Sequence, residues 1–258
     1  MTEFQFITTS IQKEIGIVEL NRPKQYNSLN RQMVREIVEA LEAFEHDEFV
    51  RVMIISGRGK AFSSGADIDE MASDDSIRLE LLNQFADWDR VALLKKPIIG
   101  AVHGYVFGGG FELALSCDVL IAAEGTEFCF PEVNLGVMPG AGGTQRLTKL
   151  VGRTKALEWI WSAKRIPANE ALQYGVVNRV VQPELLLEEA LKFADTISKK
   201  PPLAIRLIKE SVTKAVDYSL YEGMQYERKN FYLLFSSEDQ KEGMNAFVEK
   251  RTPHFKGR

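Results

Sequence analysis

A glutamate follows three consecutive glycines in an otherwise apolar stretch, VFGGGFELALSCD (106–118). The neighbours of Glu112 leave no polar face on the helix that this segment predicts. An ionised carboxylate in such surroundings is costly unless it is paired or neutralised. The helix N-terminus favours its charged form and the apolar surroundings favour its protonated form. Glu112 is therefore a candidate acid–base group, although acidic residues are also common in the first turn of ordinary helices.

Glu132 is a second glutamate with apolar neighbours, in the segment FCFPEVNLG (128–136). It follows a predicted strand and a loop that Pro131 stiffens. Two carboxyl groups with shifted pKa values can serve as general acid and general base in one reaction. We therefore expect Glu112 and Glu132 to act as a pair.

Glycine-rich loops follow two of the predicted strands, at SSGAD (63–67) and at GGG (108–110). Loops at the ends of parallel strands are common ligand sites. Free backbone N–H groups from two such loops could point at one oxygen atom and form an oxyanion hole. The alternative is that these glycines only shape turns. Neither 57–60 nor 140–143 matches the P-loop or the dinucleotide-binding fingerprint, so the sequence does not predict either nucleotide site.

Alternating strands and helices must position these groups. Strands and helices that alternate along a chain indicate βαβ crossovers and a mostly parallel sheet, hence an α/β core. After about residue 178 the pattern is helical, and from 183 to 250 it is broken only by Pro201-Pro202 and near Ser236-Ser237. The predicted strands are 4–10, 15–20, 50–55, 98–102 and 119–123, and the predicted helices include 31–44, with Asn30 as N-cap, and 76–94.

Composition excludes several classes of protein. The 258 residues are 45% hydrophobic and 26% charged, with a net charge of −4, which does not indicate a nucleic-acid-binding surface. The two cysteines, Cys117 and Cys129, have neither metal-site nor redox-pair spacing, and they suit a reducing compartment. The start MTEFQF lacks a signal-peptide profile, and no run of about 18 apolar residues occurs. We expect a cytoplasmic protein without a metal, a nucleic-acid partner or a membrane span.

Several segments resemble the enoyl-CoA hydratase, or crotonase, family, in order and over nearly the whole chain. The resemblance implies a crotonase-like spiral of ββα units, with an α/β core over 1–195 and a C-terminal helical trimerisation region over 196–258. It also implies a homotrimer, or a homohexamer made of two trimers. The segments are NRPKQYNSLN (21–30), AFSSGAD (61–67), KPIIGAVHGYVFGGGFELALSCD (96–118), FCFPEVNLGVMPGAGGTQRL (128–147), ALEWIWSAKRIPANEALQYGVVNRV (156–180) and EGMNAFVEKR (242–251).

The resemblance also assigns roles. The N–H groups of Ala66 and Gly109 would hold the thioester carbonyl in an oxyanion hole. Glu112 would act chiefly on the water that adds to the β-carbon, and Glu132 would deliver the proton to the α-carbon. The substrate's coenzyme A would contact Ala66, Gly109, Lys24, Ser64, Asp67, Ile68 and, from a neighbouring subunit, Phe247 and Lys250. As alternatives, the two lysines are ordinary surface residues, Phe247 belongs to an apolar helix stripe, and Asp67 caps a helix.

The activity that the resemblance implies is hydration of a 2-enoyl-CoA to a 3-hydroxyacyl-CoA, in fatty-acid β-oxidation or a related acyl-CoA degradation. Neither a metal nor a redox cofactor is needed, because coenzyme A enters with the substrate. One alternative is an enoyl-CoA isomerase, which needs a single base. Another is a non-catalytic acyl-CoA-binding protein. Phe107, Phe111 and Phe130 are bulky, and we expect them to influence which acyl chains fit.

Overall fold

A six-stranded sheet forms the centre of the fold. The computed structural model describes residues 4–258, so residues 1–3 of the expected core and of the segment MTEFQF lie outside the described residues. Strand order is β1-β2-β3-β4-β6-β9, with β1 and β2 antiparallel and the other neighbours parallel. The strands are β1 (Ile7–Gln12), β2 (Ile15–Leu20), β3 (Val52–Gly57), β4 (Ile98–Val102), β6 (Val119–Ala123) and β9 (Arg179–Val181).

A smaller sheet of three strands, in the order β5-β7-β8, carries the segments that lead into the candidate site. These strands are β5 (Tyr105–Phe107), β7 (Glu127–Cys129) and β8 (Ile166–Pro167). The helices of the core are η1 (Pro23–Gln25), α1 (Arg31–His46), α2 (Ile68–Met71), α3 (Ser76–Leu82), α4 (Ala86–Ala92), α5 (Gly109–Leu115), η2 (Glu132–Leu135), α6 (Gly143–Val151), α7 (Arg153–Trp161), α8 (Ala168–Gln173), η3 (Pro183–Leu185) and α9 (Leu186–Ser198).

Apolar residues on the two faces of the large sheet form two separate clusters. Val18, Met53 and Ile55 belong to the cluster that includes α1 and α5. Ile17 and Ile54 belong to the other cluster, which α9 completes. Successive strand residues point to opposite faces, so a strand buried on both faces is apolar throughout. The α/β core predicted from the sequence is thereby confirmed.

Several boundaries differ from the prediction. The region expected to be one helix, 76–94, is two helices, because Asn83 adopts a left-handed conformation (φ 44°, ψ 43°) that ends α3. Asparagine is one of the few residues besides glycine that adopts this conformation readily. The first strand begins at Ile7 rather than Phe4, because Ile7 faces Leu20, the last residue of β2, and it extends to Gln12, which faces Ile15. The strand predicted at 50–55 is Val52–Gly57.

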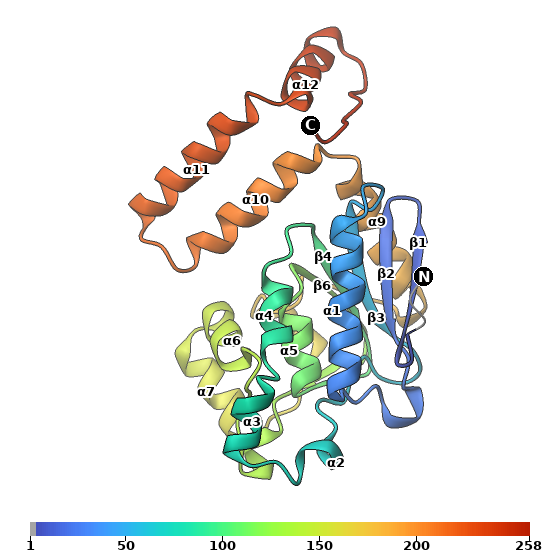
Figure 1. Ribbon diagram of the computed structural model, residues 1–258, viewed down its shortest axis with the longest axis vertical. Helices are drawn as coiled ribbons and strands as arrows, with labels where there is room; N and C mark the ends of the chain where they lie inside the picture. Colours follow the sequence, from blue (N-terminus) through green and yellow to red (C-terminus); the bar gives the residue numbers. More distant parts are fainter. Residues whose placement is uncertain (1–3) are drawn as a thin grey trace.

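Three helices, α10 (Pro202–Ala215), α11 (Leu220–Leu234) and α12 (Glu238–Glu249), form an arm outside the core (Figure 1). The helical region breaks at Pro201 and Ser237 as predicted, and also before Ser219, which starts α11 with a capping box to Glu222. The expected boundary between residues 195 and 196 lies inside α9, and the division into core and arm stays a prediction.

Candidate active site

Glu112 lies in the first turn of α5 and is almost completely buried, with 4% of the residue exposed. The start of α5 is fixed by Gly108, whose N–H donates to the Cys129 carbonyl of β7 at 2.9 Å. Gly108 has φ +50° and ψ −126°, a combination that residues with a side chain rarely adopt. The glycine therefore lets the chain pass directly from β5 into α5 and places Glu112 in the first turn of this helix.

A loop distant in sequence holds the Glu112 carboxylate. The N–H groups of Ala141 and Gly143 donate to the same oxygen, Glu112 Oε1, at 2.7 and 2.8 Å. Burial raises the pKa of Glu112, while these two hydrogen bonds and the positive charge of Arg146 oppose the rise. Hydrogen bonds to backbone N–H groups stabilise the charged form of a carboxylate. This arrangement suits a group that must be ionised and ready to accept a proton.

Glu132 lies at the start of η2 in a different environment. Its Oε2 is buried and has no hydrogen-bond partner within residues 4–258. Burial raises the pKa of Glu132 to about 7; its own backbone N–H opposes the rise and the negative charge of Glu112 adds to it. A Cβ at Gly108 would lie 3.1 Å from Glu132 Oε1, so the Glu132 carboxyl group adjoins the turn that starts α5, the helix of Glu112. Glu132 therefore keeps its proton to higher pH than an ordinary glutamate.

Glu132→Gln is expected to raise the melting temperature at about pH 8 by a few degrees and to have little effect at about pH 5. The folded-state pKa of about 7 exceeds the ordinary value of 4.5, so the folded protein binds more protons in that interval. Wild-type stability therefore falls as pH rises through the interval, whereas glutamine stays neutral. Thermal unfolding followed by circular dichroism across this range tests the prediction. A difference between the two proteins that does not change with pH would contradict it.

Two unpaired N–H groups lie side by side near these carboxyl groups. A Cβ on Gly109 would be 3.7 Å from the Ala66 nitrogen. Leu29 pairs with the neighbours of Ala66, because its N–H donates to Gly65 and its carbonyl accepts from Asp67. Neither Ala66 N–H nor Gly109 N–H donates to an acceptor within residues 4–258. Two adjacent free donors have the form of an oxyanion hole.

Strand β5 joins the two glycine-rich loops. Ser63 forms a parallel bridge with Val106: its N–H donates to Tyr105 at 3.1 Å, and its carbonyl accepts from Phe107 at 3.0 Å. Gly110 packs closely on Ser63, where a Cβ would be 2.6 Å from the serine Cβ. The loop containing Ala66 and the first turn of α5 are thus fixed to each other.

The other predicted binding residues fall into two groups. Four of them, Lys24, Ser64, Asp67 and Ile68, lie in or near the Ala66 loop. Lys24 is exposed in η1, and the Ser64 hydroxyl donates weakly to the Gln25 carbonyl at 3.4 Å. Asp67 precedes Ile68, which is exposed. The Asp67 side chain makes no helix cap and pairs instead with Arg22 at 2.9 Å. That ion pair is one feature the sequence analysis missed.

Phe247 and Lys250 lie far from this group. Both belong to the end of α12, and Phe247 is 86% exposed. In Figure 1, α12 lies at the end of the molecule opposite α2 and α3. A single chain therefore does not bring these two residues to its own carboxyl groups.

One expectation from the sequence needs correction. Phe111 and Phe130 do not line a substrate space, because both are fully buried and their rings stack with centroids 4.6 Å apart. The sequence pattern did not assign the loop at 140–143 to Glu112, whose carboxylate this loop binds. The start of α6 was the feature of the sequence that could have indicated this contact, because the first N–H groups of a helix have no partner within the helix and can bind an anion.

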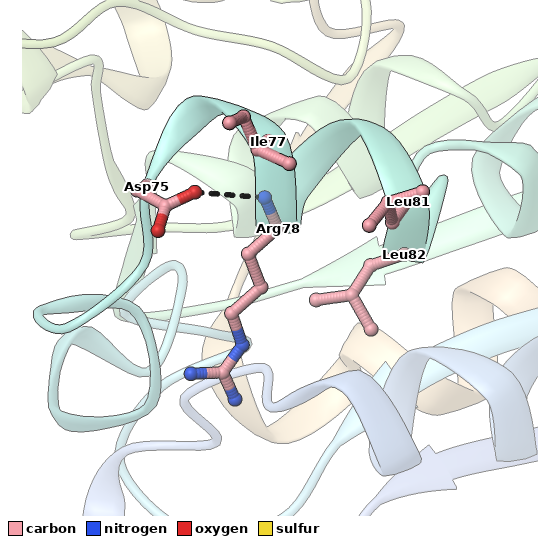
Figure 2. Close-up of a pocket in the computed structure, with 5 residues that line it drawn as sticks. All are labelled: Asp75, Ile77, Arg78, Leu81 and Leu82. Atoms are coloured by element: carbon pink, nitrogen blue, oxygen red, sulfur yellow. Dashed lines mark hydrogen bonds between the residues drawn. The ribbon is translucent and has the colours of Figure 1, made fainter.

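One surface hollow lies apart from the carboxyl pair. The hollow in Figure 2 is lined by α3 and its cap Asp75, and includes none of the candidate site residues. Among residues 4–258, no group of three or more His, Cys, Asp or Glu side chains is arranged to hold a metal ion. Within the same range, no helix combines the length and apolar character needed to cross a bilayer.

Comparison with known proteins gives consistent matches along the chain. The model of the family described as "Enoyl-CoA hydratase/isomerase" matches residues 10–258. A "Probable enoyl-CoA hydratase" of Rhizobium meliloti (strain 1021) is 44% identical over 255 residues, covering 99% of each chain. The "2,3-dehydroadipyl-CoA hydratase" of Escherichia coli (strain K12) is 40% identical over 252 residues, covering 98% of this chain and 99% of the relative.

Solved structures agree with this result. A crystal structure from Geobacillus kaustophilus HTA426, described as "Enoyl-CoA Hydrates Subunit I", is 64% identical with a TM-score of 0.98 and full coverage of both chains. An enoyl-CoA hydratase from Bacillus anthracis is 36% identical with a TM-score of 0.93, covering 98% of this chain and all of that one. The fold predicted from the sequence is confirmed.

Proposed function

The chain belongs to the enoyl-CoA hydratase/isomerase family, and from that premise we propose that it is a hydro-lyase acting on 2-enoyl-CoA thioesters. It adds water across the 2,3 double bond and yields the 3-hydroxyacyl-CoA. The observation that carries this assignment is the pair of carboxyl groups in unlike environments. Glu112 is bound by two N–H donors, and Glu132 has a buried oxygen that has no hydrogen-bond partner among residues 4–258.

The first half of the reaction adds the water oxygen to the β-carbon. Glu112 accepts a proton from the water as the new carbon–oxygen bond forms, and the electrons of the double bond move toward the thioester carbonyl. The N–H groups of Ala66 and Gly109 donate to the resulting enolate oxygen. Such donors stabilise the transition state because the charge develops where they already point.

The second half places a proton on the α-carbon. Glu132, which holds its proton up to about pH 7, donates it to the enolate carbon, and the carbonyl re-forms. Glu112 then carries the proton taken from water and Glu132 is ionised. Transfer of one proton from Glu112 to Glu132 restores the starting state, so the hydration balances without an oxidant or a metal.

Turnover of crotonyl-CoA tests this function, followed as loss of the absorbance of the conjugated thioester. A series from crotonyl-CoA to hexadecenoyl-CoA, with branched and aromatic members, would define the acyl group. Formation of 3-hydroxyacyl-CoA is the expected result. Tight coenzyme A binding without turnover of any member of the series would support a non-catalytic family member instead. Movement of the double bond without water addition would support an isomerase, which needs one base, whereas this chain has both glutamates.

Assembly and location belong to the same proposal. We propose a homotrimer, alone or paired into a hexamer, in which Phe247 and Lys250 reach the coenzyme A of a neighbouring subunit. The exposed apolar side chains of the arm, such as Leu220 (82%) and Tyr221 (71%), support such contacts.

We also place the protein in the cytoplasm, with no metal or redox cofactor. Burial raises the pKa of the Cys129 thiol to about 11, which keeps it unreactive.

A further inference from the structure

The loop that binds Glu112 is itself held by two phenylalanine rings. Residues 139–143 form this loop, called the clamp loop below. The buried ring of Phe130 packs on Gly143, where a Cβ would lie 2.7 Å from the ring. The ring of Phe85, which is 42% exposed, packs on Gly140, where a Cβ would also lie 2.7 Å from the ring. Phe130 belongs to the core, but Phe85 comes from a separate surface segment.

Gly140 is a glycine for reasons of space. It is not among the residues with positive φ, so its backbone conformation does not require glycine. A side chain there would instead collide with the Phe85 ring, since contacts below 3.0 Å force one of the two groups to move. The close contact between Phe85 and Gly140 is therefore a specific feature of this chain's packing.

Phe85 belongs to a segment that hydrogen bonds link to α1. It occupies the N-cap position of α4. The residue before it, Gln84, accepts a hydrogen bond from Arg31 Nε of α1 at 3.1 Å. Arg90 of α4 donates to Glu42 of α1 at 2.9 Å. The segment that carries Phe85 is thus attached to α1 in the core. The Phe85 ring in turn connects this segment to the clamp loop.

We propose that Phe85 is a positioning residue for Glu112: by packing on Gly140, it keeps the clamp loop where the Ala141 and Gly143 N–H groups reach the carboxylate. This inference rests on the proposed role of Glu112 as the base. Loss of the ring would loosen the clamp loop and weaken the two hydrogen bonds to the Glu112 carboxylate. Weaker hydrogen bonds would disfavour the ionised form of Glu112.

The charged groups that face Glu112 stay unchanged when the ring is removed. They are Arg146 from α6 and Glu132 from η2. A shift in the ionisation of Glu112 in a Phe85 variant would therefore report the hydrogen bonds of the clamp loop. It would not report a changed charge nearby.

Phe85→Ala is the first test, with crotonyl-CoA as substrate. We expect kcat to fall about tenfold with KM nearly unchanged, because a misplaced catalytic group slows the chemical step. The acid limb of the pH profile of kcat/KM should move to higher pH, since Glu112 would need a higher pH to ionise. Phe85→Leu should restore most of the activity and the wild-type profile. Phe49→Ala, at a phenylalanine that is 80% exposed, is the matched control and should change nothing.

Gly140→Ala perturbs the same contact between the Phe85 ring and residue 140 by changing the loop residue. Its new Cβ must displace the Phe85 ring, so we expect a similar loss of kcat and a similar shift of the acid limb. In a chain that already carries Phe85→Ala, the same substitution should have little further effect. Coupling of this kind is typical of residues that act through one contact.

Two results would overturn the inference. One is an unshifted acid limb in a folded Phe85→Ala protein. The other is an effect confined to KM that varies with acyl-chain length, which would make the ring a wall of the substrate space. Glu112→Gln separates this failure from failure of the proposed function. If Glu112→Gln is inactive while Phe85→Ala has an unshifted profile, only the inference about Phe85 is lost; if Glu112→Gln hydrates at the wild-type rate, the role of Glu112 as the base in the proposed function is lost.

Discussion

Glu112→Gln is expected to lower kcat for crotonyl-CoA hydration by about a thousandfold. The glutamine oxygen can still accept the hydrogen bonds from Ala141 and Gly143, which lie at 2.7 and 2.8 Å in the wild type, so the local structure should persist. What is lost is the ability to take a proton from water. Steady-state kinetics with crotonyl-CoA, together with calorimetric binding of 3-hydroxybutyryl-CoA, would show a large loss of kcat and a nearly unchanged Kd.

Glu36→Gln is the matched control for this variant. Glu36 is also a buried glutamate, 7% exposed, and it also accepts two backbone hydrogen bonds, from Gln5 and Phe6. It lies on α1, apart from the clamp loop and η2. Glu36→Gln should therefore keep wild-type kcat. Equal losses in Glu112→Gln and Glu36→Gln would mean that charge removal acts through stability alone, against the assigned role.

Glu132→Gln should reduce kcat by about a hundredfold or more, through the second half of the reaction. The amide cannot supply the proton for the α-carbon, although Glu112 can still activate water. In deuterated solvent, the reverse reaction offers a separate readout, because exchange of the α-proton of 3-hydroxybutyryl-CoA requires Glu132. We expect this exchange to slow at least as much as hydration. Exchange at the wild-type rate in Glu132→Gln would show that another group moves the proton.

Much of the fold could be predicted because local signals agree with tertiary packing. Asn30 caps α1 with its side chain at 2.8 Å from Met33 N, as the spacing predicts. The strands Ile98–Val102 and Val119–Ala123 have the predicted boundaries, because continuous apolar runs are typical of central parallel strands. The burial of Glu112 could also be predicted, since apolar residues surround it in the chain.

The contacts that set the ionisation of the carboxyl groups could not be predicted in this way. Ala141 and Gly143 reach Glu112 from about thirty residues away in sequence, and only the folded chain shows which carboxyl group they bind. The packing of Phe85 on Gly140 likewise depends on the break at Asn83, which places the ring after a turn. Long-range contacts of this kind have no signature in local periodicity.

Glu112 and Glu132 should behave as one catalytic unit, the first activating water and the second protonating the α-carbon, and a double-mutant cycle with crotonyl-CoA measures whether they do. Groups that act as a unit have strongly non-additive effects on kcat. We expect the double variant Glu112→Gln/Glu132→Gln to have a kcat within about tenfold of that of the less active single variant. If the two losses multiply, or if either single variant keeps the wild-type kcat, the two carboxyl groups do not form one catalytic unit.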